Sequence, residues 1–203
     1  MEGLIEGVLI VLKKGGWVLL PIFLLAQVGW AVVTERLWVL MLAKGKSKLF
    51  WKKAPREPEA LRQFLAQNKV TKGLLDQVFK KISQVSHQGE TAMVLSAKEV
   101  LNEKVPLLQK HLSTLAIMAY SAPLLGLLGT VSGMIATFDI IEIYGVGNPA
   151  MMAEGISEAL LTTQAGLVVS FPLMLVHNHL LNRVDHIETE CIENTTKLIN
   201  LLR

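Results

Sequence analysis

The sequence predicts an all-α membrane protein with three transmembrane helices, the second and third extended into the cytoplasm as long helices. Of its 203 residues, 51% are hydrophobic and only 18% are charged, whereas soluble domains carry about 25% charged residues. The charges are also unevenly distributed, because residues 15–34, 112–138 and 159–182 contain none. Each window is long enough to cross a bilayer as a helix, which requires about 20 apolar residues.

The N-terminal part of the chain predicts a surface helix followed by the first span. Residues 1–14 have the apolar spacing of a short amphipathic helix lying on the outer membrane surface. Residues 15–42 form the first transmembrane helix, which Pro21 can kink. Two glutamates in the leader and the lack of a small-residue cleavage site argue against a removed signal peptide.

The distribution of positive charge predicts the topology. Residues 43–111 contain 14 lysines and arginines against six acidic residues, whereas residues 139–158 contain four acidic residues and no basic one. Since basic loops stay in the cytoplasm, we expect residues 43–111 and the C-terminus inside and the N-terminus outside. The lysines just after the first span predict a topology anchor beside the lipid headgroups rather than a nucleic-acid site; they are Lys44, Lys46, Lys48, Lys52 and Lys53.

The cytoplasmic insert, residues 43–111, is expected to be helical. Its apolar residues recur at steps of three and four, and one such stripe runs from Val94 to Leu115 without a break. We therefore expect one long helix to enter the second span, residues 112–138, with a kink near Pro106. A short periplasmic loop, residues 139–157, leads to the third span, residues 158–182. The same spacing continues beyond that span and predicts a cytoplasmic C-terminal helix over residues 183–203.

The second span contains two adjacent rows of small residues at i,i+4 spacing. These rows are Ala122, Gly126, Thr130 and Gly129, Gly133, Thr137. Small residues at this spacing let membrane helices approach closely. We therefore interpret the three glycines, with Gly166 of the third span, as helix-packing residues.

The third span carries a row of polar residues. Glu158, Thr162, Gly166 and Ser170 share one i+4 row, with Thr163 alongside. Polar side chains within a span must face a neighbouring helix or a water-filled path. A carboxyl group at the membrane rim is also compatible with a simple interfacial position, so both interpretations of Glu158 remain open.

Other polar residues point to no enzyme chemistry. His177 and His179 point to different sides of a helix, so they cannot share a metal ion, and interfacial packing is favoured over a role in proton exit. The single cysteine, Cys191, excludes an intrachain disulfide. We find no nucleophile–base pair, metal cluster or phosphate-binding loop, and we expect no catalytic residue, metal or cofactor.

Two strings resemble the ExbB/TolQ/MotA proton-channel family, with the ExbB/TolQ branch the closer match. They are APLLGLLGTVSGMI in the second span and GISEALLTTQAGL in the third. The resemblance implies a homopentamer around a dimer of an ExbD- or TolR-like single-span protein, which supplies a protonatable aspartate. It further implies that proton flow moves a TonB- or TolA-like protein in the bacterial inner membrane.

The family's pore-lining positions can be transferred residue by residue. Its second-span threonine matches Thr130, its third-span glutamate Glu158 and its third-span threonine Thr163, with Thr162 adjacent. Ser132 departs from the pattern, since many relatives have a bulky aromatic residue there. The favoured function is that of an ExbB-like energy-coupling subunit. The alternatives are a TolQ-like subunit and a non-conducting membrane scaffold.

Overall fold

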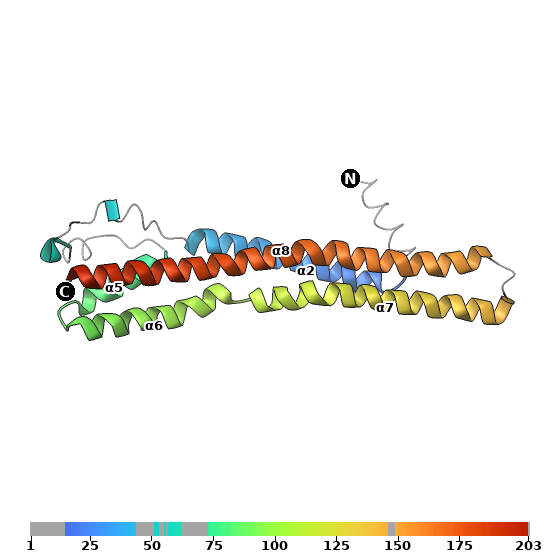
Figure 1. Ribbon diagram of the computed structural model, residues 1–203, viewed down its shortest axis with the longest axis horizontal. Coiled ribbons are helices and arrows are strands. Elements are labelled where there is room, and N and C mark those ends of the chain that lie inside the picture. The colour runs from blue at the N-terminus through green and yellow to red at the C-terminus, as the bar shows by residue number, and fades with distance from the viewer. Residues whose placement is uncertain are drawn as a thin grey trace. The chain divides into compact units, whose positions relative to one another are not determined.

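The computed structural model describes residues 15–43, 51–52, 55, 57–61, 73–145 and 149–202, and every element assigned there is a helix (Figure 1). The helices are α2 (Leu19–Ala43), α5 (Leu74–Val85), α6 (Glu90–Gln109), α7 (Leu112–Tyr144) and α8 (Pro149–Leu202). The expected helix over residues 1–14 and four of the five anchor lysines, Lys44, Lys46, Lys48 and Lys53, lie outside the described residues.

The predicted fold class is confirmed. Three helical stretches are long and apolar enough to cross a membrane: Leu19–Ala43, Glu90–Tyr144 and Pro149–Leu202. The second stretch comprises α6 and α7, and the third is α8 alone, so the latter two are the long ones. The charge-free windows 112–138 and 159–182 lie inside the second and third stretches, and most of the window 15–34 lies inside the first.

The helix boundaries differ from the expected ones at two places. Pro106 stays inside α6 on its exposed side, and the chain instead turns at Lys110 and His111. His111 has a φ of 64°, the left-handed conformation that commonly ends a helix. The expected loop over residues 139–157 is mostly helical, since α7 continues to Tyr144 and α8 begins at Pro149. Charge marks where the membrane ends, but it does not by itself end a helix.

The chain divides into two compact units, which we describe separately: residues 1–34 with 112–178, and residues 35–111 with 179–203. In the second unit, α5 and α6 pack against each other as a hairpin, and Gly89 with a φ of 98° forms the turn before α6. The apolar stripes predicted for these helices and for the end of α8 are buried. They include Leu74, Leu75, Val78, Phe79, Ile82, Ala97, Val105, Leu108, Val184, Cys191, Leu198 and Leu202.

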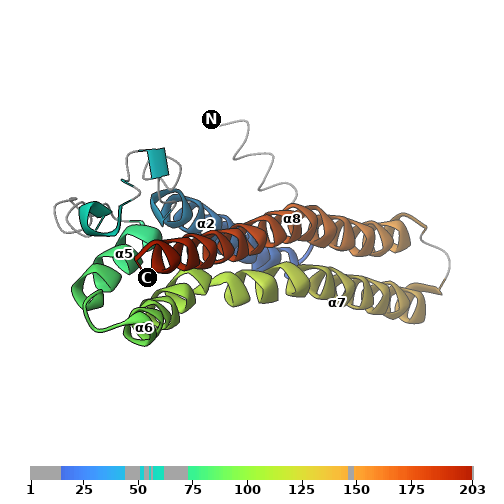
Figure 2. The same cartoon turned by 60° about the vertical axis from the view of Figure 1, so that its left-hand side comes forward.

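The first unit is built from α7, the first part of α8 and the beginning of α2. Residues of α7 and α8 contact each other in antiparallel order, and both views show the two helices side by side (Figures 1 and 2). The first turns of α2 pack on this pair through Val18, Leu19 and Ile22, which are buried. Their apolar partners are Leu125 of α7 and Leu161, Ala165 and Val169 of α8.

Candidate functional site

Glycines bring the backbones of α7 and α8 into direct contact. A methyl group added at Gly126 would lie 3.0 Å from Cα of Thr163, and one at Gly133 would lie 2.8 Å from the carbonyl oxygen of Gly155. One at Gly166 would lie 2.6 Å from the carbonyl oxygen of Ala122. Gly129 packs directly against the side chain of Thr162. At Gly129, Gly133 and Gly166 an added methyl group would therefore overlap α8 or α7, and at Gly126 it would force a small displacement.

Two hydroxyl groups link α8 to the backbone of α7. Thr163 Oγ1 donates to the carbonyl oxygen of Gly126 over 3.1 Å, and Ser170 Oγ donates to that of Ala119 over 2.7 Å. Residue 123, four positions after Ala119, is a proline without an N–H group, so the hydroxyl of Ser170 donates to a carbonyl that lacks its usual helical donor. The carbonyl of Gly126 keeps a backbone N–H at Thr130 as its helical donor, and its second lone pair can accept from Thr163. The two bonds lie on either side of Gly166 and fix the register of the helix pair.

The other hydroxyls in the contact bond within their own helices. Thr137 donates to the carbonyl oxygen of Gly133 over 2.9 Å, and Thr162 donates to that of Ala159 over 2.8 Å. The side chain of Thr162 is enclosed, with only 1% of its surface exposed. In this chain Thr162 therefore packs the contact, and its place in a proton path stays a prediction.

Thr130 and Glu158 lie at the edges of the contact. Both are half-buried, and Thr130 Oγ1 donates to the carbonyl oxygen of Leu127 over 2.7 Å. The carboxylate of Glu158 lies against Gly16, in the turn before α2. No hydrogen bond among the described residues joins Glu158 to Thr130 or Thr163. The structure thus brings Thr162 and Thr163 together with the glycines. The other two residues contact other parts of the chain, because Thr130 bonds within α7 and Glu158 lies against the turn before α2.

The remaining polar residues of the sequence analysis occupy separate positions. His177 is buried and its Nδ1 lies 3.3 Å from Oδ1 of Asn178, whereas His179 is exposed. Cys191 is a buried free cysteine. Within the described ranges no group of three or more histidine, cysteine or acidic side chains could hold a metal ion.

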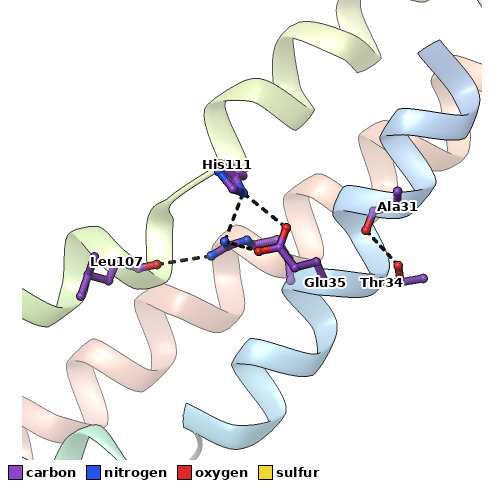
Figure 3. Close-up of polar contacts among 6 residues, drawn as sticks. Ala31, Thr34, Glu35, Leu107 and His111 are labelled. Carbon is purple, nitrogen blue, oxygen red and sulfur yellow. Dashed lines mark hydrogen bonds and ion pairs between the residues drawn. The ribbon is translucent and has the colours of Figure 1, made fainter. Parts of the chain in front are cut away.

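A buried arginine near the end of α2 was not singled out by the sequence pattern. Arg36 is 4% exposed and donates to the carbonyl oxygen of Leu107 over 3.3 Å and to Oε1 of Glu35 over 2.9 Å (Figure 3). It also lies 3.2 Å from Nδ1 of His111, in the turn between α6 and α7. We call Glu35, Arg36, Leu107 and His111 the Arg36 cluster. Its only sequence signal is a lone arginine two residues after a charge-free window.

Arg36 and Glu35 both lie beside Nδ1 of His111. Arginine can only donate hydrogen bonds, so Nδ1 accepts from Arg36 in the tautomer that leaves this nitrogen without a proton. Glu35 Oε2 lies 3.4 Å from the same Nδ1, and this pair becomes an ion pair only when His111 is protonated. The cluster therefore connects α2 to the turn after α6 through one guanidinium with three partners.

The fold and the site define a helical membrane protein whose second and third spans pack through glycines and carry hydroxyls and a carboxylate. The profile of the MotA/TolQ/ExbB proton channel family matches residues 66–193. The chain therefore belongs to this family, as the sequence motifs predicted. The match includes all of α7 and most of α8.

Several curated proteins are similar to this chain. A biopolymer transport protein ExbB homologue of Methanothermobacter thermautotrophicus is 32% identical over 143 residues, which cover 70% of this chain and 48% of the relative. The biopolymer transport protein ExbB of Aquifex aeolicus is 40% identical over 77 residues, 38% of this chain and 52% of the relative. The Tol-Pal system protein TolQ of Haemophilus influenzae is 29% identical over 116 residues, which cover 55% of this chain and 51% of the relative. The chain thus spans about half the length of these relatives.

Proposed function

We propose that this chain is the ExbB-like subunit of a proton-driven motor in the bacterial inner membrane and is not itself an enzyme. In this proposal five copies surround a dimer of an ExbD-like single-span protein, and the assembly energises TonB-dependent transport across the outer membrane. The N-terminus is periplasmic and the C-terminus cytoplasmic. Family membership and similarity to proteins named ExbB support the proposal.

One structural observation carries the role of the site. The hydroxyls inside the α7–α8 contact are bonded to backbone carbonyls, while Glu158 is a half-buried carboxyl group at the edge of the contact. A carboxyl group can take up and release a proton, and a nearby threonine oxygen can accept a hydrogen bond from it or from water. We therefore propose that Glu158 and Thr130 contact the moving proton, with Thr163 and Thr162 behind them.

Proton flux tests these roles. Glu158→Ala and Thr130→Ala are each expected to abolish energised transport and to lower proton flux into reconstituted vesicles by about 100-fold, as loss of a positioned proton-transfer group does. Thr34→Ala is the matched control, since Thr34 is exposed and its Oγ1 donates to the carbonyl oxygen of Ala31 over 2.9 Å, the same local bond as at Thr130 (Figure 3). Full transport with both site substitutions in place would refute the assignment.

Composition of the assembly tests the rest of the proposal. Affinity purification from native membranes in mild detergent, followed by native mass spectrometry, should yield five copies of this chain with two of a small aspartate-bearing single-span protein. A TonB-like third component supports the ExbB-like assignment. A TolA-like one would instead establish a TolQ-like subunit, which the similarity to TolQ makes the second candidate.

A non-conducting scaffold is the remaining candidate, and one observation favours it. Every threonine hydroxyl named above donates to a backbone carbonyl, as expected of a packing seam. In that case Glu158→Gln would change the stability of the oligomer but leave proton-dependent work unchanged. A monomer or dimer without a single-span companion would also support the scaffold.

A further inference from the structure

The turn before α2 contains a glycine that directly faces the carboxylate of Glu158. Gly16 has a φ of 64°, a backbone conformation that glycine adopts freely and other residues adopt at a cost. A methyl group added at Gly16 would lie 2.7 Å from Cδ of Glu158 and would overlap its Oε1. The space that a side chain at position 16 would fill is therefore occupied by this carboxylate.

Apolar packing holds the turn in place. Two and three residues after Gly16, Val18 and Leu19 are buried against α7 and α8 with exposed fractions of 2% and 4%. On the other side, a methyl group at Gly15 would lie 3.3 Å from Cδ2 of Leu161. Because the residues that follow the turn are buried, we expect the backbone of the turn to resist displacement. The side chain of Glu158 has a flexible end and can move.

We propose that Gly16 is a positioning residue for Glu158. By presenting a bare backbone, Gly16 lets the carboxylate lie against the turn that begins α2, and any side chain there displaces it. The placement of the carboxylate follows from these contacts alone. Its consequence for proton transfer rests on the function proposed above.

Chemical labelling measures the placement without relying on proton transfer. Full-length protein in its native membranes is treated with dicyclohexylcarbodiimide, which reacts with protonated carboxyl groups, and labelling at position 158 is followed by peptide mass spectrometry. Gly16→Ala should raise the labelling rate several-fold, because the displaced carboxyl group leaves the turn. Gly145→Ala is the matched control: Gly145 has a φ of 66°, and no described atom lies within 4 Å of the added methyl group. It should label as wild type does.

A shorter acid at position 158 should remove the effect of Gly16→Ala on the labelling rate. Glu158→Asp withdraws the carboxylate by one methylene, so adding Gly16→Ala to it should change the labelling rate little, a non-additivity expected only of groups in contact. The inference is overturned if Gly16→Ala labels position 158 at the same rate as wild type or Gly145→Ala. It is also overturned if the effects of Gly16→Ala and Glu158→Asp on the labelling rate are fully additive.

Proton flux separates this inference from the proposed function. Gly16→Ala is expected to reduce flux about tenfold or more, since a misplacement of about 1 Å can cost up to 100-fold. Raised labelling with normal flux would support the positioning by Gly16 while removing Glu158 from the proton path. Reduced flux with unchanged labelling would overturn the positioning role and leave the proposed function standing.

Discussion

The close contact between α7 and α8 predicts a large penalty for a single methyl group at Gly166. In Gly166→Ala the new Cβ would lie 2.6 Å from the carbonyl oxygen of Ala122, and 3.2 Å and 3.3 Å from Cα and N of Gly126. All three are backbone atoms, so no side-chain rotation relieves the overlap. The helices must separate by a few tenths of an ångström or more.

The magnitude follows from three effects. Overpacking of a close contact costs about 1–3 kcal/mol. Separation also stretches the two bonds that Thr163 and Ser170 donate to α7, and such bonds contribute about 0.6 kcal/mol each in membranes. The higher helix propensity of alanine offsets about 1 kcal/mol. We therefore expect Gly166→Ala to lower the free energy of unfolding by about 1–3 kcal/mol.

Gly29→Ala is the matched control for this experiment. Gly29 is also a helical glycine at a helix contact, but its methyl group would meet only side-chain atoms of Leu173, the nearest at 3.0 Å. That side chain can adjust, and the higher helix propensity of alanine acts here too, so Gly29→Ala should leave the free energy of unfolding unchanged or raise it by up to about 1 kcal/mol. Reversible SDS unfolding of the purified protein in phospholipid bicelles measures both variants. Equal unfolding free energies for Gly166→Ala and Gly29→Ala would refute the assignment of a backbone contact.

Two further predictions concern residues of the second unit. Arg36→Lys should lower the free energy of unfolding by about 1–3 kcal/mol, because an ammonium group cannot reproduce the guanidinium fork that reaches Leu107 and His111. Thermal unfolding should show no comparable loss of stability for the control Lys104→Arg, because its partner Glu103 is exposed. If Arg36→Lys were as stable as wild type, the contacts assigned to the Arg36 cluster would be contradicted. Burial raises the pKa of the Asp76 carboxyl group above its ordinary 3.8, and Oδ2 finds no hydrogen-bond partner among the described residues. The folded state then binds the proton more tightly than the unfolded state, so this contribution to stability is fully present below about pH 3.8 and is lost as pH rises through the folded pKa. Asp76→Asn should therefore be more stable than wild type at pH 7 and equal to it below pH 3.8 in denaturant titrations; equal stability at both pH values would count against the buried carboxylate.

Much of this architecture could be predicted from local sequence, because its causes are local. A bilayer excludes charge, so charge-free windows identify spans, and glycine rows such as Gly126 with Gly129 and Gly133 identify a face that approaches another helix. The apolar stripes of α5 and α6 follow from helical periodicity in the same way. These features depend on residues three or four positions apart.

Features that depend on tertiary contacts could not be predicted. Nothing near His111 in the sequence marks it as the residue with a left-handed backbone, and Pro106 was the more obvious place for a break. Arg36 gains two of its three partners, Leu107 and His111, only because residues more than 70 positions away fold beside it. The contact between Gly16 and Glu158 joins the two chain segments that make up the first unit, and neither residue signals it alone.

The distribution of polar bonds indicates which parts of the site can move. Thr163 and Ser170 bond to the backbone of α7, and Gly166 between them lies against the backbone of Ala122 and Gly126, so we expect α7 and this part of α8 to move as one pair. Glu158 belongs to the same pair, yet its carboxylate lies against the turn of α2. If Glu158 gains or loses a proton during proton transfer, we expect the change in charge to act on that turn, because the carboxylate lies directly against Gly16. The start of α2, and not the α7–α8 contact, is therefore where we expect protonation to alter the structure of this chain.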